Sequence, residues 1–313
     1  MKILNLEPED FSRDAISIYR EIGEYIEIED LNQLREIDKG EISILISRLK
    51  YKIDKNMLSQ FPNLKYIVSA TTGIDHIDQN YSKEKNCQVI SLKPHKEFLQ
   101  TITTTPELTW GLVIALIRKI PFAFNDVMHG NWDRDLYRGE QISGKTIGIV
   151  GMGRIGNQIA QYANAFGMDI IYYDPYVDNT KFKKQKCLKN IFQLSNIVVL
   201  CVHLNSETKD MINYEILKNH FKNGYLINTS RGRIVNEADL AKAIDENIIQ
   251  GYAADVISNE TNGLENNILY KKCLEGKNII LTPHIGGASL EIMNKCELYL
   301  SNEILKKLHE NIF

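Results

Sequence analysis

The chain has no apolar stretch long enough to cross a bilayer and no large excess of either charge. Its formal net charge of −3 over 313 residues gives no reason to expect nucleic acid or an anionic membrane as a partner. The first ten residues, MKILNLEPED, reach acidic side chains at once and lack the apolar core of a signal peptide. We therefore expect neither a nucleic-acid partner nor a membrane partner.

Cysteine is scarce and scattered. The five cysteines are odd in number and never stand in C-x-x-C spacing. This pattern argues against a disulfide framework and against a zinc site, and it favours a reducing cytoplasm. The hydrophobic content of 43% and the charged content of 25% are those of an ordinary globular protein, and the length suits two domains better than one.

Residues 1 to about 100 alternate short apolar runs with helical spacings. Such alternation predicts a parallel sheet covered by helices, so we expect a first α/β domain here. Strands are expected at 3–4, 25–28, 42–46, 65–68 and 88–92, with a helix at 11–22 and another capped by Asp54.

A polar loop, SATTGIDHID (residues 69–78), follows the fourth of these strands. Ligands of parallel sheets gather at the carboxyl ends of strands, and Gly73 could let backbone N–H groups face a small carboxylate. The cluster of Asp75, His76 and Asp78 could suggest a metal. Helix capping and turn formation explain these residues without a metal, and we expect none.

The stretch from Lys145 to Pro175 organises the second half of the chain. A β-branched run at 147–150 precedes GMGRIG (residues 151–156), which spells G-x-G-x-x-G, and a helical pattern follows through Phe166. A second apolar run at 169–173 completes a strand–turn–helix–strand unit. In such a unit the helix N-terminus meets a pyrophosphate.

The residues of this unit predict NAD as the cofactor. Gly151 permits the tight turn, Gly153 lets the pyrophosphate approach backbone N–H groups, and Gly156 lets the helix pack closely on the strand. Asp174 stands where a carboxylate accepts hydrogen bonds from the adenosine ribose, and it would repel the 2′-phosphate of NADP. Four lysines between 181 and 186 could in principle meet a phosphate, but a solvated loop is the simpler interpretation.

The connection between the two halves begins with a well-marked helix start. Thr105 as N-cap, Pro106 at the first helical position and Glu107 in the first turn predict a helix to about Lys119, apolar almost all round and therefore buried between domains. The aromatic-rich segment 121–144 has no sheet periodicity. It is either an irregular connection or an arm that packs on a second subunit.

After the glycine-rich unit the alternation resumes, which predicts a complete doubly wound nucleotide domain. We assign residues 101–283 to this domain and residues 1–100 and 284–313 to the other. The expected strands are 197–202, 225–228, 249–253 and 278–281, and the expected helices are 214–220, 238–245 and 288–309.

Three titratable side chains stand at or just past the ends of late strands of this domain. Arg231, a planar and permanent cation, suits a substrate carboxylate, and His284, which titrates near neutrality, suits the transfer of a hydroxyl proton. Glu260 could fix the tautomer of the imidazole and stabilise its protonated form. Singly each residue has an ordinary explanation, but together beside a nicotinamide they indicate hydride transfer between NAD and a 2-hydroxy acid.

The blocks SATTGIDHID, TTTPELTWGLVIALIR, VGMGRIG with YYDP, INTSRG and LTPHIGG resemble the D-isomer-specific 2-hydroxyacid dehydrogenase family over essentially the whole chain. This family includes phosphoglycerate dehydrogenases and glyoxylate reductases. The resemblance implies two doubly wound parallel-sheet α/β domains, a Rossmann-type NAD domain and a flavodoxin-like substrate domain, with the active site in the cleft. It also implies a homodimer formed through the NAD domain.

The resemblance also implies site residues. The family's catalytic Arg, Glu and acid/base His fall on Arg231, Glu260 and His284. Arg231 would bind substrate together with Thr72, Gly73 and Ile74. The implied cofactor contacts are Thr72, Gly151, Gly153, Arg154, Ile155, Gly156, Asp174, Thr229, Asp255 and Gly287.

The chain departs from the family pattern in places. The family usually has Pro after the Glu, whereas Glu260 is followed by Thr261-Asn262-Gly263 in a longer loop, which leaves assignments within 261–277 open. Asn205 replaces a common Pro, which weakens any contact assigned to Leu204. No regulatory domain is expected after Phe313.

The substrate and one functional alternative stay open. Arg48 and Lys50 could favour a second anionic group, as in 3-phosphoglycerate, although surface charge is the simpler interpretation. Glyoxylate, hydroxypyruvate and other small 2-oxo acids are equally compatible. The chief alternative function is an NAD(H)-binding sensor of the corepressor kind with little turnover. A methyltransferase would leave Arg231, Glu260 and His284 without a role.

Overall fold

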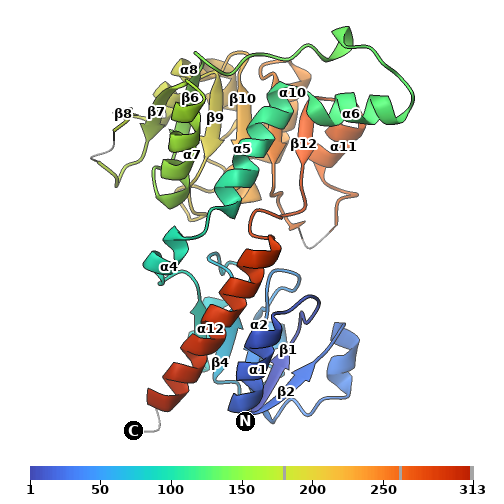
Figure 1. Ribbon diagram of the computed structural model, residues 1–313, viewed down its shortest axis with the longest axis vertical. Helices are drawn as coiled ribbons and strands as arrows, with labels where there is room; N and C mark the ends of the chain where they lie inside the picture. Colours follow the sequence, from blue (N-terminus) through green and yellow to red (C-terminus); the bar gives the residue numbers. More distant parts are fainter. Residues whose placement is uncertain (179–180, 261–262, 311–313) are drawn as a thin grey trace. The chain divides into compact units, whose positions relative to one another are not determined.

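The computed structural model describes residues 1–178, 181–260 and 263–310, and the chain forms two compact units (Figure 1). The first unit comprises Met1–Ile102 and the segment from Ala288 onward, and the second comprises Thr103–Gly287. His284 therefore lies in the second unit, whereas the sequence analysis assigned residues 284–313 to the first. The fold class is nevertheless the expected one, α/β with two parallel sheets.

The described part of the first unit contains a five-stranded parallel sheet in the order β2-β1-β3-β4-β5. This order is the flavodoxin-like one. Neighbouring residues of a strand face opposite sides, as Ile3 and Leu4 of β1 do, and the two faces bury separate apolar clusters. The strands are β1 Lys2–Asn5, β2 Glu24–Glu27, β3 Ile42–Ile46, β4 Tyr66–Ser69 and β5 Gln88–Ser91.

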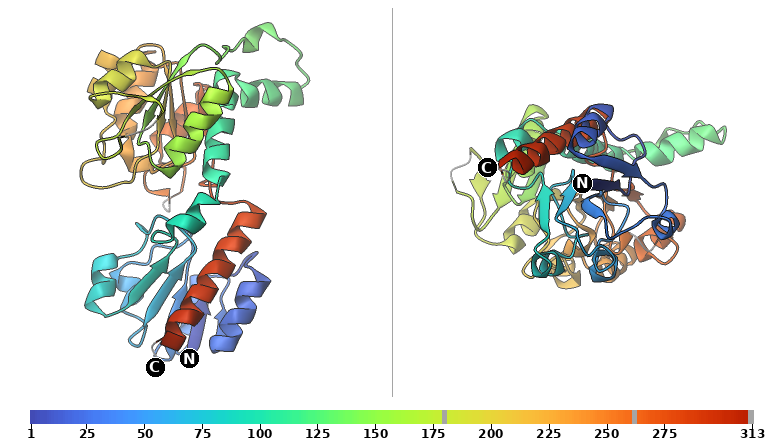
Figure 2. Two further views of the ribbon diagram at one scale, coloured as in Figure 1. Left: turned by 60° about the vertical axis from the view of Figure 1, so that its left-hand side comes forward. Right: turned by 90° about the horizontal axis from the view of Figure 1, so that it is seen from below.

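Helices cover both faces of this sheet. One face is covered by α1, α4 and α12, and Figure 2 shows the long α12 running beside α1. The other face is covered by α2, α3 and a 3₁₀ turn, and Asp54 caps α2 as expected by accepting a hydrogen bond from Met57 N. The helices are α1 Arg13–Ile22, α2 Lys55–Leu58, α3 Gln79–Glu84, α4 Lys96–Gln100 and α12 Leu290–Glu310, and the 3₁₀ turn is η1 Leu31–Arg35.

The second unit contains a seven-stranded parallel sheet in the order β12-β11-β10-β9-β6-β7-β8. Reading from β6, the order reverses between β6 and β9, which makes this the switch point where a doubly wound fold binds its ligand. The strands are β6 Thr146–Val150, β7 Asp169–Tyr173, β8 Lys183–Lys184, β9 Ile197–Leu200, β10 Tyr225–Asn228, β11 Gly251–Ala254 and β12 Ile279–Leu281.

Two apolar layers sandwich this sheet. The helices α5 and α7 pack on one face, and α8, α9, α10 and α11 pack on the other. Because both faces are buried, the central strands β9 and β10 are almost entirely apolar rather than alternating. The helices are α5 Thr104–Ile117, α7 Arg154–Ala165, α8 Leu188–Leu194, α9 Tyr214–His220, α10 Glu237–Asp245 and α11 Ile268–Leu274.

The connection between α5 and β6 differs from the sequence prediction. The helix α5 begins at Thr104 with Thr103 as N-cap, so the expected N-cap Thr105 was wrong by two residues. The segment after it is not irregular throughout, because it contains α6 Ile120–Met128 and a 3₁₀ turn, η2 Asp135–Tyr137. Both figures show α6 projecting away from the rest of the second unit. We call residues 120–141 the arm.

The lysine-rich segment after β7 is also more ordered than expected. Lys183 and Lys184 form the edge strand β8, which pairs in parallel with β7, and both side chains are exposed. Lys184 contacts Asp178 at 2.5 Å. None of the helices in the described residues combines the length and the apolar character needed to cross a membrane.

Candidate functional site

The glycine turn between β6 and α7 has the geometry that a pyrophosphate needs. Gly151 has φ +94°, and a Cβ there would lie 2.5 Å from the carbonyl oxygen of Cys201. A Cβ on Gly156 would lie 2.1 Å from the Gly151 carbonyl oxygen, so only glycine allows helix and strand to approach this closely. A Cβ on Gly153 would meet nothing within 4 Å, which leaves that side of the turn open to a ligand. The residues present therefore fit a dinucleotide.

Asp174 lies directly after β7 and joins that strand to the glycine turn. Its Oδ2 accepts a hydrogen bond from Met152 N at 2.8 Å, and its Oδ1 accepts from Tyr176 N and Val177 N at 2.8 and 3.1 Å. Asp174 is only 8% exposed. A carboxylate has about four acceptor sites, so capacity for one more donor remains. Of the other predicted contacts, Arg154 begins α7, Ile155 packs partly into the core, and Gly287 is exposed.

Glu260 and His284 meet although they are far apart in the sequence. His284 Nδ1 lies 2.6 Å from Glu260 Oε2, and the side chains are 25% and 34% exposed. The other carboxylate oxygen, Oε1, accepts a hydrogen bond from Ile257 N at 3.3 Å. An ionised carboxylate only accepts, so Nδ1 carries a proton and Nε2 is the ring atom directed elsewhere.

The backbone of His284 is in the left-handed region, with φ +56°. His is one of the few residue types enriched there, but the conformation still needs support. Asp255 provides this support, because its carboxylate accepts hydrogen bonds from Thr282 Oγ1, Ile285 N and Gly286 N at 2.5 to 2.9 Å. Burial raises the pKa of Asp255. The sequence analysis assigned Asp255 to a cofactor contact and missed this local role.

Arg231 follows β10 and is held through its backbone. The buried Asn228 side chain donates a hydrogen bond to the Arg231 carbonyl oxygen at 2.9 Å and accepts one from Ser230 N. The guanidinium Nη1 donates to the Ser230 carbonyl oxygen at 2.7 Å. The strands β10, β11 and β12 are neighbours, so Arg231, Glu260 and His284 stand at the same edge of one parallel sheet.

Thr229 precedes Arg231 and is tied to α5. Its Oγ1 lies 2.7 Å from Thr109 Oγ1, and Thr109 donates to the Thr105 carbonyl oxygen. Thr105 Oγ1 donates to the Gly286 carbonyl oxygen at 3.0 Å, which links the start of α5 to the His284 loop. No sequence pattern pointed to Thr109, because only the fold brings α5 beside β10.

In the first unit the loop after β4 is organised by its own side chains. Thr71 Oγ1 donates to the Gly73 carbonyl oxygen at 2.8 Å and lies 3.0 Å from Ser69 Oγ. Asp78 caps α3 by accepting a hydrogen bond from Tyr81 N. In the described ranges, no group of three or more His, Cys, Asp or Glu side chains could hold a metal ion. The predicted contacts Thr72, Gly73 and Ile74 lie on this loop.

An anion-binding role of Arg48, which was left open as the alternative to surface charge, does not fit its contacts. The guanidinium Nε and Nη2 donate to Glu297 Oε1 at 2.9 and 2.5 Å, and Nη1 donates to the Glu9 carbonyl oxygen. Each guanidinium nitrogen is thus used inside the first unit. Lys50 extends over the Tyr51 ring instead. Arg48 therefore gives no support to a phosphorylated substrate.

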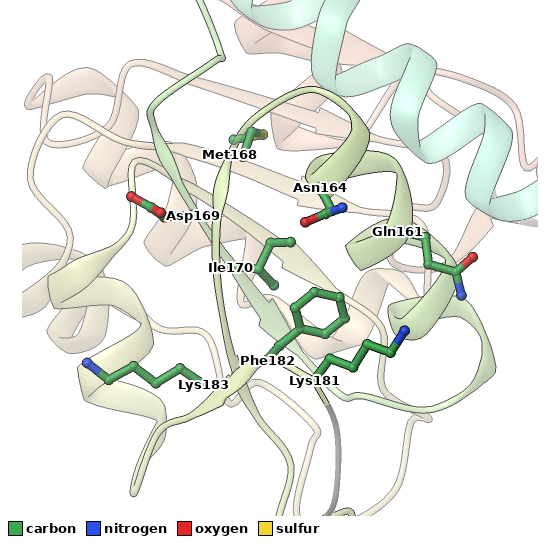
Figure 3. A pocket seen from close by; sticks show the side chains of 8 residues that line it. All are labelled: Gln161, Asn164, Met168, Asp169, Ile170, Lys181, Phe182 and Lys183. Atoms are coloured by element: carbon green, nitrogen blue, oxygen red, sulfur yellow. The ribbon is translucent and has the colours of Figure 1, made fainter.

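A cavity of about 490 Å³ in the second unit contains none of the predicted site residues (Figure 3). It lies beside the start of β7, whereas the glycine turn stands at the carboxyl end of β6. Its polar walls are exposed side chains, so we assign it no role in the chemistry. The lining residues are Gln161, Asn164, Met168, Asp169, Ile170, Lys181, Phe182 and Lys183.

Comparison with known proteins identifies both units. Residues 110–286 match the model of the D-isomer specific 2-hydroxyacid dehydrogenase NAD binding domain, and residues 9–94 match the model of the catalytic domain. A hydroxypyruvate reductase of Thermotoga maritima is 32% identical over 86% of this chain and 85% of its own length. A D-3-phosphoglycerate dehydrogenase of Methanocaldococcus jannaschii is 31% identical over 98% of this chain, which spans 57% of that protein.

A solved structure, the TT0316 protein from Thermus thermophilus, has a TM-score of 0.85 and 25% identity over 99% of this chain and 97% of its own. The fold, the NAD-binding domain and the sequence relatives agree with the geometry of the glycine turn. The chain therefore belongs to the D-isomer-specific 2-hydroxyacid dehydrogenases, which are NAD-dependent oxidoreductases that transfer a hydride between nicotinamide and a small 2-hydroxy or 2-oxo acid.

Proposed function

We propose that Arg231, Glu260 and His284 carry the chemistry of this dehydrogenase. The observation that supports the proposal is the 2.6 Å contact of Glu260 with His284 Nδ1, because it commits one ring nitrogen and leaves Nε2 to exchange a proton with substrate. Bound NADH would supply the hydride that reduces the carbonyl carbon. His284 Nε2 gives its proton to the carbonyl oxygen during reduction and takes it back during oxidation.

Arg231 and Glu260 support this proton transfer in different ways. The Arg231 guanidinium binds the substrate carboxylate with two parallel hydrogen bonds and places the carbonyl beside His284. Glu260 holds the Nδ1–H tautomer and stabilises the imidazolium that is needed for reduction. Its partial exposure allows this contact to persist in both protonation states without burying an isolated charge.

The cofactor contacts belong to the same proposal. The backbone of the glycine turn, with Arg154 and Ile155, faces the pyrophosphate, and the remaining acceptor capacity of Asp174 serves the adenosine ribose. Thr229 and Asp255 lie next to Arg231 and His284, respectively, where the nicotinamide end of the cofactor belongs. The assignments of Gly287 and Thr72 to cofactor, and of Thr72, Gly73 and Ile74 to substrate, rest on the family resemblance.

We test the function with purified protein, NADH and a panel of 2-oxo acids, following the loss of reduced-nicotinamide absorbance. The expected result is turnover with small unphosphorylated acids such as glyoxylate or hydroxypyruvate. Turnover confined to 3-phosphohydroxypyruvate would contradict the interpretation of Arg48 as a structural residue. Tight NADH binding with no turnover on any acid would favour the sensor function over the enzyme.

We also propose that the arm joins two copies of the chain into a homodimer through the NAD domain. Apolar side chains of this segment are exposed in the single chain: Phe124 by 65%, Met128 by 68% and Trp132 by 90%. Large exposed apolar surfaces mark interaction sites. Sedimentation of the wild-type protein should give a dimer, and Trp132→Asp should weaken it, whereas a wild-type monomer at micromolar concentration contradicts the proposal.

A further inference from the structure

The loop that carries Glu260 is fastened to the beginning of α10 by one carboxylate. Glu237, the first residue of α10, accepts a hydrogen bond from Ser258 N through Oε1 at 2.6 Å. Its Oε2 accepts from Asn267 Nδ2 at 2.8 Å. Asn267 in turn caps α11, because its Oδ1 accepts from Leu269 N and Tyr270 N. One side chain therefore holds both ends of the segment 258–267.

The same loop is packed against the residue that follows Arg231. A Cβ on Gly232 would lie 2.0 Å from the carbonyl carbon of Ile257 and 2.4 Å from Ser258 N. The peptide between Ile257 and Ser258 thus touches Gly232 on one side and is hydrogen-bonded by Glu237. Immediately before it, Ile257 N donates to Glu260. The Arg231 loop and the Glu260 loop consequently meet at one peptide group, which Gly232 contacts and Glu237 hydrogen-bonds.

The partners of Glu237 show that its carboxylate is held by neutral donors. They include the backbone amide of Ser258 and the side-chain amide of Asn267, and the Ser258 side chain contributes as well. The titratable groups that face it are Glu260 from the same loop and Tyr252 from β11, neither of them a cation. Burial, and to a smaller extent Glu260, raises the pKa of Glu237. A half-buried carboxylate among amides is costly, and its benefit is that it orients the groups that donate to it.

We propose that Glu237 is a positioning residue for Glu260: by holding the peptide at Ser258 it sets the distance of the Glu260 carboxylate from His284. The inference deepens the proposed function and rests on it. In this proposal Glu237 acts through Glu260 and not by touching the reacting atoms. Its effect on the reaction passes through the protonation of His284, since a displaced Glu260 stabilises the imidazolium less.

The experiment compares Glu237→Ala with Glu237→Gln and with a matched control. Glutamine keeps an acceptor for Ser258 N, whereas alanine removes both hydrogen bonds. The control is Asn213→Ala, which removes the cap of α9 (Asn213 accepts from Ile216 N) in the same unit without touching the Glu260 loop. Loss of such a cap lowers stability as a purely structural change does, so the control separates a general loss of stability from a displaced Glu260.

The readout is the titration of the His284 imidazole in the full-length protein, followed by NMR with labelled histidine and assigned with His284→Ala. Glu260→Gln serves as the reference for complete loss of the carboxylate, and we expect it to shift the His284 titration to lower pH by about one unit. We expect Glu237→Ala to shift the titration in the same direction by about half of that or more. We expect Glu237→Gln to restore most of the difference, and Asn213→Ala to leave the titration in place.

The outcomes separate this inference from the function on which it rests. A shift in Glu260→Gln with none in Glu237→Ala overturns the positioning role and leaves the Glu260–His284 pair intact. No shift in either variant removes the pair itself. Should Glu237→Ala not fold, Glu237→Asp decides the matter, because the shorter side chain keeps the carboxylate but cannot reach both Ser258 N and Asn267 Nδ2. Its His284 titration should shift to lower pH, and an unmoved titration in a folded Glu237→Asp overturns the positioning role.

Discussion

Two of the close contacts between a carboxylate and a basic side chain, one in each compact unit, have opposite surroundings. In the first unit Arg48 and Glu297 are 18% and 1% exposed, and in the second His284 and Glu260 are 25% and 34% exposed. The Arg48 guanidinium uses all three nitrogens inside the protein, and Glu297 Oε2 also accepts a hydrogen bond from Ser12 N.

The difference between the pairs is one of unused hydrogen-bonding capacity. The hydrogen bonds of the Arg48–Glu297 pair connect α12, the end of β3 and the turn before α1. This pair therefore stabilises the fold and has no group available to a ligand. In the Glu260–His284 pair only Nδ1 of the imidazole is hydrogen-bonded to the carboxylate, which leaves Nε2 to a substrate. Such a pair is a candidate for catalysis when one of its polar atoms is not used within the pair. Breaking each pair in turn tests this criterion.

The largest effect should follow from opening the first pair. Glu297→Ala leaves a mostly buried guanidinium and the amide of Ser12 without their acceptor, so the free energy of unfolding should fall by about 3 kcal/mol or more. Denaturant unfolding measures this. At temperatures where the variant is folded, the pH profile of kcat/KM should be unchanged. A moved profile would mean that the first pair also takes part in the reaction.

Removing the basic side chain of the second pair should lower activity and leave stability nearly unchanged. His284→Ala should lower kcat by roughly a hundredfold or more, because the proton donor is lost, while NADH affinity and thermal stability stay close to those of the wild type. Steady-state kinetics and NADH fluorescence titration measure the two quantities. Equal losses of turnover and NADH binding would speak against the assigned role.

Glu260→Gln should have a smaller and more specific effect. The imidazolium loses its anionic partner, so His284 gives up its proton at lower pH. Reduction of a 2-oxo acid needs the protonated form, and the fall of kcat/KM with rising pH should therefore occur about one unit lower than in the wild type. An unmoved limb would remove Glu260 from the pair.

The smallest effect concerns Glu237, which has a half-buried carboxylate held by amides. Because burial raises its pKa in the folded state, the folded protein holds this proton to higher pH than the unfolded chain does. The stability that follows is present below the ordinary glutamate range and is lost as the pH rises through the folded-state value. The stability of the wild type relative to Glu237→Gln should thus decline as the pH rises from about 4 toward neutrality, and a constant difference would contradict the raised pKa.

The parts of the fold that could be predicted best are those whose pattern has a local cause. Strands buried on both faces are predominantly apolar, so β10 was placed at Tyr225–Asn228 and β3 at Ile42–Ile46, as observed. The predicted start of α5 was wrong because Thr103, Thr104 and Thr105 are equivalent as candidate N-cap residues. The structure uses the Thr105 hydroxyl for the distant Gly286 carbonyl, a bond that no local pattern encodes.

The arm and the candidate site show the same limit. The helix α6 was not predicted, although its apolar residues Ile120, Phe124, Val127 and Met128 have the spacing of one helix face; these side chains are exposed in the single chain. Arg231 and His284 could be placed by their position after strands of one parallel sheet. The contribution of Glu237 could not, since its partners Ser258 and Asn267 are 21 and 30 positions away and carry no motif. Thr261 and Asn262 lie outside the described residues.

The fastening of the Glu260 loop at Ser258 and Asn267 has a consequence for protein engineering. A segment clamped at both ends can change in length or composition between the clamps without moving either end. The stretch after Glu260 is therefore a natural position for grafting sequences from other dehydrogenases. Changes confined to it should leave the peptide at Ser258, and with it the contact of Glu260 with His284, in place.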